Sequence, residues 1–353
     1  MKIANINIQT VASVLFSLFP AILFAMEPVK LPGFTASPYF DEQVATFYFD
    51  DEIRIQINAP SANSFDGNKP AGLALYALPN GNSIEHTVGK VLKTGDDWHY
   101  DIQHIGAQTR FLRQKITSYN LVVVYLETKQ KSWPLWKSQH ADYSGIIKSL
   151  VEYLKSCFKA YSPFIILTGH SGGGRFIFSF IDAPSGIPDD VKRICFLDSN
   201  YGYEHTYGDR LMEWLNSSEE HFLSVLAYDD SIALFNGKPV VSAMGGTWHK
   251  SRMMQKYFSN FYTFTTEQDE EFIVHSALNG RIEILLKKNP QREILHTVQV
   301  ERNGFIHTML TGTESESKGY RYYGTRVYPD LIQSEELPES NNQLPLPLPA
   351  INQ

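Results

Sequence analysis

The chain has 353 residues, of which 43% are hydrophobic, 13% aromatic and 20% charged. This is the composition of an ordinary globular protein and excludes a collagen, a coiled coil and a wholly disordered chain. The 31 basic and 38 acidic side chains give a net charge of -7 without a dense Lys/Arg block, which argues against binding to nucleic acid or to an anionic membrane surface. Two cysteines are too few for a disulfide scaffold or a four-cysteine zinc site.

Residues 1–25 have the pattern of a secretory signal peptide. Lys2 precedes an apolar run from Val11 to Ala25, which is too short to cross a bilayer comfortably and suits the core of a signal. We expect cleavage after Ala25, with an uncleaved anchor as the alternative. In either case the body of the protein is expected to be exported, to the periplasm or the medium. After cleavage residues 26–44 form a lead-in, and no stable membrane span is expected.

Apolar runs bounded by turn residues follow along the chain. Residues 52–60 alternate, with isoleucines at every second position, which predicts an early, half-buried strand. The later runs are continuous, which is typical of strands buried on both faces of a parallel sheet. They cover residues 72–81, 120–127, 163–171, 193–200, 222–230 and 293–300.

Helical patterns separate several of these runs. The clearest is an apolar stripe along residues 146–158, and a second helix is predicted over residues 101–116 with Asp101 as its N-cap. The alternation predicts an α/β fold with a doubly wound, mostly parallel sheet. We expect residues 231–290 to form an excursion over the sheet edge, and the Pro- and Asn-rich residues 331–353 to be a disordered tail.

The strongest functional signal is the sequence GHSGGG at residues 169–174. It follows a buried-strand pattern and precedes a helical run, which is the context that the motif G-x-S-x-G requires. Ser171 is expected in a strained turn that projects its hydroxyl from the carboxyl end of the sheet. The following helix would direct its positive end at the site, where the Gly172 N–H becomes an oxyanion donor. The alternative is a glycine-rich turn that binds phosphate, but no Walker lysine follows.

In this motif and in the order of its elements, the chain resembles the α/β-hydrolase superfamily over residues 45–330. The resemblance implies a serine nucleophile, an acid and a histidine in that chain order. It places the acid after the second strand beyond the motif, where Asp230 is preferred and Asp229 is a close rival. Asp198, at the end of the preceding strand, is a third candidate, because some members of the superfamily draw the acid from there.

Two histidines compete for the role of the base, which the resemblance places after the last strand. His296 lies inside the apolar run 293–300, where a core or strand histidine is the plainer interpretation. His307 follows that run, in a loop that contains a glycine. The predicted triad is therefore Ser171, Asp230 and His307, and its histidine depends on 293–300 being the last strand.

Further site residues are predicted from loops at the same edge of the sheet. The loop after the first long buried strand carries Asn80 and Gly81, which are expected to supply the second oxyanion donor, with a plain Asn-Gly turn as the alternative. Trp133 and Trp136 follow the next buried strand. Together with His170 they are predicted to contact substrate, with ordinary packing as the alternative.

These assignments predict an exported serine hydrolase that cleaves a carboxylic ester, or an amide by the same chemistry, in a small-molecule or polymeric acyl substrate. No cofactor or metal is required: His99 and His104 do not share a helix face, and no zinc motif accompanies them. The alternative is a non-catalytic protein of the same fold that binds a carbohydrate or a peptide through its aromatic loops.

Overall fold

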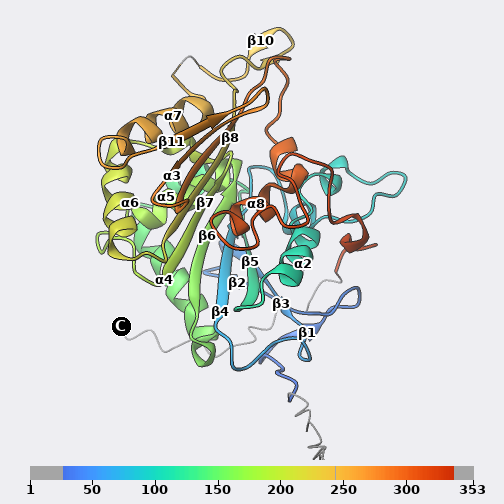
Figure 1. The fold of residues 1–353 in the computed structure, drawn as a ribbon. Helices are drawn as coiled ribbons and strands as arrows, with labels where there is room; N and C mark the ends of the chain where they lie inside the picture. Colours follow the sequence, from blue (N-terminus) through green and yellow to red (C-terminus); the bar gives the residue numbers. More distant parts are fainter. Residues whose placement is uncertain (1–26, 243, 338–353) are drawn as a thin grey trace, which may run out of the picture.

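A mixed sheet of 11 strands runs through the centre of the molecule (Figure 1). The computed structural model describes residues 27–337 except residue 243, so the predicted signal peptide and residues 338–353 lie outside the described part. In spatial order the strands are β1 (Thr35–Ala36), β2 (Glu42–Phe49), β3 (Ile53–Pro60), β5 (Asn120–Thr128), β4 (Ala71–Ala77), β6 (Phe164–His170), β7 (Val191–Leu197), β8 (Phe222–Tyr228), β13 (Ile282–Lys287), β12 (Phe272–Ala277) and β11 (Thr265–Gln268).

The middle of this sheet is parallel. Strands β5, β4, β6, β7, β8 and β13 run in one direction, whereas β1 to β3 at one edge and β11 and β12 at the other are antiparallel. From β4 the chain order runs outward in both directions, to β5 on one side and to β6 on the other. In open sheets of this kind ligands bind at the carboxyl ends of the strands beside such a reversal. The predicted α/β class is confirmed, and the topology is consistent with the α/β-hydrolase fold.

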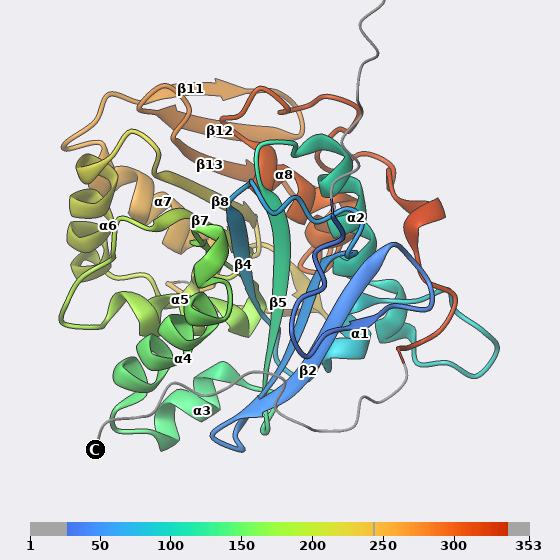
Figure 2. The same cartoon turned by 90° about the horizontal axis from the view of Figure 1, so that it is seen from below.

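Helices cover both faces of the sheet (Figures 1 and 2). One face carries α3 (Trp133–Gln139), α4 (Tyr143–Cys157), α5 (Gly174–Ile181), α6 (His205–Ser217) and α7 (Gly246–Phe258), and the other carries α1 (Ile84–Val88), α2 (Ile105–Lys115) and α8 (Phe305–Leu310). The parallel strands are apolar at successive positions because each face has its own core. In β6, Ile165 and Leu167 enter one core and Ile166 enters the other.

The two predicted helices are present, but one begins differently. Helix α4 matches the apolar stripe predicted at 146–158. Helix α2 starts at Ile105, and its N-cap is His104 in a left-handed conformation with φ 47°. Asp101 does not cap it and instead accepts a hydrogen bond from Nε2 of His104 at 2.7 Å. The predicted cap was wrong because a single helical turn, Trp98–Asp101, precedes the main helix.

The segment 231–290 contains more of the sheet than predicted. A small hairpin, β9 (Leu234–Phe235) and β10 (Lys238–Pro239), lies outside the main sheet, and helix α7 packs on one face of that sheet. Strands β11 to β13 extend it, and β13 pairs in parallel with β8, so the last strand is β13. Residues 293–300 form a loop that runs into a helical segment, because the apolar side chains from Val300 to Leu310 recur at helical spacing and enter the core that α2 covers.

The ends of the domain also extend further than predicted. Strand β2 begins at Glu42, and Leu31 of the expected lead-in is buried. Near the other end, Gln333 is buried, and its side chain accepts a hydrogen bond from Arg110 at 3.1 Å. Residues 331–337 therefore belong to the packed domain and not to a tail. No helix within the described residues is both long enough and apolar enough to cross a membrane.

Candidate active site

Ser171 occupies a sharp turn between β6 and α5. Its φ of 54° lies in the left-handed region, which L-residues rarely adopt. The turn packs closely against the neighbouring strand ends. An added Cβ on Gly173 would lie 2.1 Å from the carbonyl oxygen of Ala77, and one on Gly174 would lie 1.8 Å from that of Ser199. The predicted sequence of strand, strained turn and helix is confirmed, and it places Ser171 at the carboxyl end of the parallel sheet.

A cavity of about 260 Å³ opens beside Ser171. Its walls come from the loop after β4, from the starts of α3 and α5, and from the turn after β7. The lining residues are Asn80, Pro134, Ser171, Gly172, Arg175, Ser199, Tyr201 and Gly202. The serine is half-buried in this wall, so a small group in the cavity lies next to the nucleophile candidate.

Two of the predicted oxyanion residues come together here, and the third does not. An added Cβ on Gly172 would lie 2.0 Å from Oδ1 of Asn80, so the Asn80 amide rests directly on Gly172. The N–H of Gly81 donates to the carbonyl of Lys131 at 2.8 Å, and the φ of Gly81 is 81°. Gly81 is therefore the glycine of a tight turn whose N–H is already used, and its assignment as an oxyanion donor was wrong.

The imidazole placed against this turn belongs to His296. Its ring packs on the ring of His170, which directly precedes Ser171, with the two centroids 4.4 Å apart. Nε2 of His170 also contacts the carbonyl oxygen of His296 at 3.2 Å. On the other side of the ring, Nδ1 of His296 is hydrogen-bonded to Oδ2 of Asp198. A carboxylate at Nδ1 holds the proton on that nitrogen and leaves the lone pair of Nε2 as an acceptor, which is the form a general base needs.

Asp198 and His296 reach each other from the carboxyl ends of two strands. Asp198 directly follows β7 with φ 47°, and His296 lies in the loop after β13. The Asp198 carboxylate is fully buried, and its second oxygen accepts a hydrogen bond from the hydroxyl of Thr247. The chain order of Ser171, Asp198 and His296 is the order that the resemblance implies, with the acid one strand earlier than predicted.

His307, the predicted base, is not brought to the turn. It lies on α8, where Nε2 is 2.9 Å from Oε1 of Glu283 and Nδ1 is 3.3 Å from the hydroxyl of Tyr320. Glu283 is on β13, three strands from β6. Burial alone would lower the pKa of His307, but the Glu283 carboxylate outweighs it and holds that pKa above its usual value. The prediction failed because 293–300 is not the last strand.

Asp230, the predicted acid, lies after β8 as expected, but its carboxylate binds the N-terminus of helix α7. Its carboxylate accepts hydrogen bonds from the N–H groups of Thr247 at 2.7 Å and Trp248 at 3.3 Å, which are free donors at the start of α7. Burial, together with the nearby Asp198, raises the pKa of Asp230 to about 7. Its rival Asp229 accepts from the hydroxyl of Ser231. Of the three candidate acids, only Asp198 is hydrogen-bonded to His296.

The three side chains predicted to contact substrate are buried instead. Trp133 and Trp136 are 2% and 1% exposed, and the ring of Trp133 packs edge-on against Phe176 with centroids 4.9 Å apart. At a spacing of three residues both indoles lie on the inner face of α3. Pro134, between them, is the residue of α3 that reaches the cavity. His170 is buried as well and supports the neighbouring imidazole.

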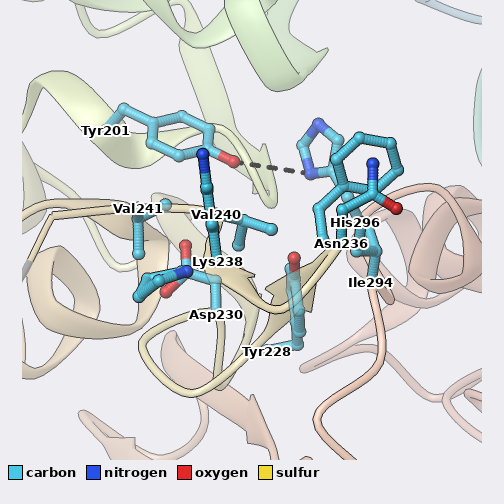
Figure 3. A pocket seen from close by; sticks show the side chains of 11 residues that line it. Tyr201, Tyr228, Asp230, Asn236, Lys238, Val240, Val241, Ile294 and His296 are labelled. Atoms are coloured by element: carbon cyan, nitrogen blue, oxygen red, sulfur yellow. Dashed lines mark hydrogen bonds between the residues drawn. The ribbon is translucent and has the colours of Figure 1, made fainter.

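A second and larger cavity, of about 580 Å³, lies on the His296 side of the turn (Figure 3). Tyr201 lines both cavities, and Figure 3 shows its hydroxyl directed at the His296 ring, 3.5 Å from Nδ1. The remaining lining residues are Tyr228, Asp230, Phe235, Asn236, Lys238, Pro239, Val240, Val241 and Ile294. Apolar side chains form much of the walls, and Lys238 and Asp230 are also among the lining residues. This space suits a group larger than the first cavity admits.

One group of side chains within residues 27–337 is close enough to share a metal ion: Glu283, His307 and Glu316, whose ligand atoms lie within 4.8 Å of one another. These residues belong to β13, to α8 and to the loop that follows α8. His307 and Glu283 already form a buried ion pair there. The group is separate from the two cavities described above, because none of its three members lines either of them.

Sequence reasoning missed three parts of this arrangement. Arg175, one residue after the glycines of the motif, was given no role, and neither was Thr247. The third is the true last strand. Residues 282–287 are an apolar run between Asn279-Gly280 and Asn289-Pro290, which are turn signals that mark the ends of a strand. These two turn signals on either side of the run identify β13, and with it the loop that carries His296.

A comparison with protein-family models finds no match for the chain, and a comparison with curated proteins finds none either. Similar solved structures include a thermostable esterase at 12% identity and a TM-score of 0.45, covering 77% of this chain and 63% of that one. An acetyl xylan esterase from Aspergillus awamori is 10% identical with a TM-score of 0.40, over 70% of this chain and 92% of the other. The chain thus spans less than two thirds of the thermostable esterase.

Proposed function

We propose that the protein is a serine hydrolase that cleaves a carboxylic ester through an acyl-enzyme on Ser171, with His296 as the base and Asp198 as the acid that orients it. One observation carries this proposal. The imidazole that packs against the strained turn of Ser171 is the same one whose Nδ1 is held by a fully buried carboxylate. Nucleophile, base and orienting acid in this relation are the requirement for acyl transfer, whatever the fold.

The reaction proceeds in two halves. Oγ of Ser171 bonds to the ester carbonyl carbon while its proton passes to Nε2 of His296, and the bond to the leaving oxygen then breaks as Nε2 returns the proton to that oxygen. Water next attacks the acyl-enzyme and gives a proton to Nε2. The carbon–Oγ bond breaks, the proton returns to Oγ, and the carboxylic acid leaves. The Ser171 hydroxyl has no hydrogen-bond partner among residues 27–337, and such catalytic contacts commonly tighten when substrate binds.

Two groups next to the serine can donate hydrogen bonds to the negative charge that develops on the carbonyl oxygen. The Gly172 N–H stands at the start of the helical segment that continues as α5, whose positive end is directed at the site. The Asn80 amide lies against Gly172 and is the second candidate donor. Losing one donor of this kind typically costs about 3 kcal/mol of transition-state stabilisation.

The test combines a covalent probe with turnover. A fluorophosphonate should label the wild-type protein but not Ser171→Ala, with both proteins equally folded by circular dichroism. On 4-nitrophenyl butyrate, His296→Gln should reduce kcat by several orders of magnitude. The matched control is His307→Gln, which removes the other candidate imidazole and should retain turnover in the folded fraction.

Two results would contradict the proposal. Labelling of Ser171→Ala at the wild-type rate would show that another residue is the nucleophile. Loss of turnover in His307→Gln with full turnover in His296→Gln would restore the base expected from the sequence. On the N-terminal pattern alone we also propose that the chain is exported, which fractionation of a tagged full-length chain would test.

A further inference from the structure

The cavity beside Ser171 contains one charged side chain, Arg175. Arg175 is the second residue of α5 and is half-buried. Within the described part of the chain its guanidinium forms neither an ion pair nor a side-chain hydrogen bond. The carboxylate about two turns further along the helix, Asp182, is already bound by Lys137 at 2.9 Å. A guanidinium offers five donors in a rigid fork, so this one can still bind a ligand.

The position of Arg175 also costs electrostatic energy in the free protein. It stands in the first turn of α5, where the helix dipole is positive and a cation is disfavoured. The same helix start carries the oxyanion-binding N–H of Gly172. Two positive features therefore meet in this cavity, and none of the described residues that line it is a carboxylate. An anion from solution or from substrate would be attracted to both.

Gly202 makes room for this guanidinium. A Cβ at position 202 would lie 3.0 Å from both Cζ and Nη1 of Arg175, so the arginine head group rests on the bare backbone of the turn after β7. The φ of Gly202 lies outside the left-handed region, so the backbone itself does not require glycine there. A side chain at position 202 would instead push the guanidinium aside.

The two cavities can be assigned to the two halves of an ester. The base must protonate the leaving oxygen, so the leaving group lies on the His296 side, in the larger and mainly apolar cavity. The acyl group then extends the other way, into the smaller cavity that Ser171 and Arg175 share. Tyr201 stands between the two halves.

We propose that Arg175 binds an anionic group at the far end of the acyl portion, so that the preferred substrates are esters of short acyl chains that end in a carboxylate or a phosphate. This inference rests on the proposed esterase function and adds the substrate class. A bidentate pair of the guanidinium with a planar carboxylate orients the acyl chain, and the fork geometry distinguishes arginine from lysine in this role.

The test compares charged and neutral versions of one ester. The substrates are the 4-nitrophenyl half-esters of succinic, glutaric and adipic acid, each beside the same compound with its free carboxyl methylated. The ratio of kcat/KM for the charged form to that for the capped form is measured at constant ionic strength, with the uncatalysed rate subtracted. The wild-type ratio should exceed one for at least one chain length, and Arg175→Gln should lower that ratio about tenfold or more.

Three further variants separate charge from geometry. Arg175→Lys keeps the charge but loses the fork, and it should retain only part of the preference. Gly202→Ala displaces the guanidinium without removing it and should lower the ratio as well. Arg252→Gln removes one positive charge from an exposed position on α7 and should leave the ratio unchanged. Phosphonate analogues of the best chain length show whether the preferred anion is a carboxylate or a phosphate.

The outcomes are distinguishable. A ratio that Arg175→Gln leaves at the wild-type value would overturn this inference, while Ser171-dependent hydrolysis of the capped esters would keep the proposed function. If the wild-type protein hydrolyses neither form of any ester and is not labelled by a fluorophosphonate, both proposals fail.

Discussion

Asp198 and Asp230 lie close together but have different hydrogen-bond partners. The Thr247 hydroxyl donates to Asp198 and lies 3.3 Å from Oδ2 of Asp230, so one side chain joins the two acids. Asp198 is hydrogen-bonded to the imidazole, whereas Asp230 accepts from the backbone at the start of α7. Two carboxylates this close disfavour each other's ionisation. Burial and the nearby Asp198 together raise the pKa of Asp230.

Exchanging each acid for its amide tests this division. Asp198→Asn presents an amide to Nδ1 of His296 and favours the wrong imidazole tautomer, so kcat for ester hydrolysis should fall by a factor of about 10⁴. Asp230→Asn keeps an acceptor oxygen for the Thr247 N–H and should retain most of the rate. Steady-state kinetics on 4-nitrophenyl butyrate measure both. If the Asp230 variant were the inactive one, the acid expected from the sequence would be correct.

The raised pKa of Asp230 also predicts a dependence of stability on pH. Burial and Asp198 raise that pKa from 3.8 to about 7, so between pH 4 and 7 the folded state holds a proton that the unfolded state has released. Stability from this group is therefore present at low pH and is lost as the pH rises through 7. Asp230→Asn cannot titrate, so relative to wild type it should be more stable at pH 8 than at pH 5.

Urea unfolding of both proteins at the two pH values gives the comparison. Only the difference between variant and wild type is interpreted, because groups distant from position 230 titrate equally in both. A difference that stays constant from pH 5 to pH 8 would contradict the raised pKa.

At the scale of elements, β13 and α8 are joined by the buried pair of Glu283 and His307. Burial alone would raise the pKa of Glu283, but His307 outweighs it and the pKa is lowered. Each partner therefore stabilises the ionised form of the other. The pair holds the last parallel strand to the helix that follows it. His307 also lines a cavity of about 310 Å³ that is separate from the one beside Ser171.

Removing one partner should destabilise the fold without ending catalysis. His307→Gln leaves the Glu283 charge buried without its partner, and a loss of about 3–5 kcal/mol is expected. The double variant Glu283→Gln with His307→Gln contains no buried charge and should be more stable than the single variant. Urea unfolding of the two single variants and the double variant measures the coupling. Strictly additive losses would show that the two side chains do not interact.

The sequence was sufficient to predict the elements that depend on local residues, but not the contacts between distant elements. The turn of Ser171 depends on neighbours within a few residues, so the strand, the glycines and the helix could all be predicted from the local sequence. The pair of Asp198 and His296 joins residues 98 positions apart, and its prediction needed the correct last strand. Residues 293–300 have the apolar content of a strand but form a loop and a helical segment, because the side chains that follow recur at helical spacing. Misplacing that one strand transferred the role of the base to His307.

At the scale of the whole molecule, the two cysteine thiols are buried to different extents. Cys195 is in the middle of β7 and fully buried, and Cys157 is half-buried on α4. Burial raises the pKa of Cys195 to about 12 and that of Cys157 to about 11. Because the thiolate is the reactive form, both should react slowly in the native protein.

Thiol labelling should therefore follow global unfolding. In the variant Cys157→Ser, Cys195 should remain unreactive toward Ellman's reagent in native buffer and should react fully in urea, with the same midpoint as circular dichroism. Cys195 lies on a central strand covered on both faces, so its exposure requires the sheet to open. Rapid labelling of Cys195 in native buffer would show that β7 opens locally.

The turn that follows β7 has a consequence for any attempt to redesign this protein. Within residues 198–202 lie the carboxylate that holds the imidazole, the tyrosine between the two cavities and the glycine under the arginine. Under the proposed function and the inferred substrate class, rate and selectivity therefore both depend on one short stretch of backbone. Grafting this loop from another protein would change both together, so selection for a new acyl group should proceed through Arg175 and Asn80, which lie on other elements.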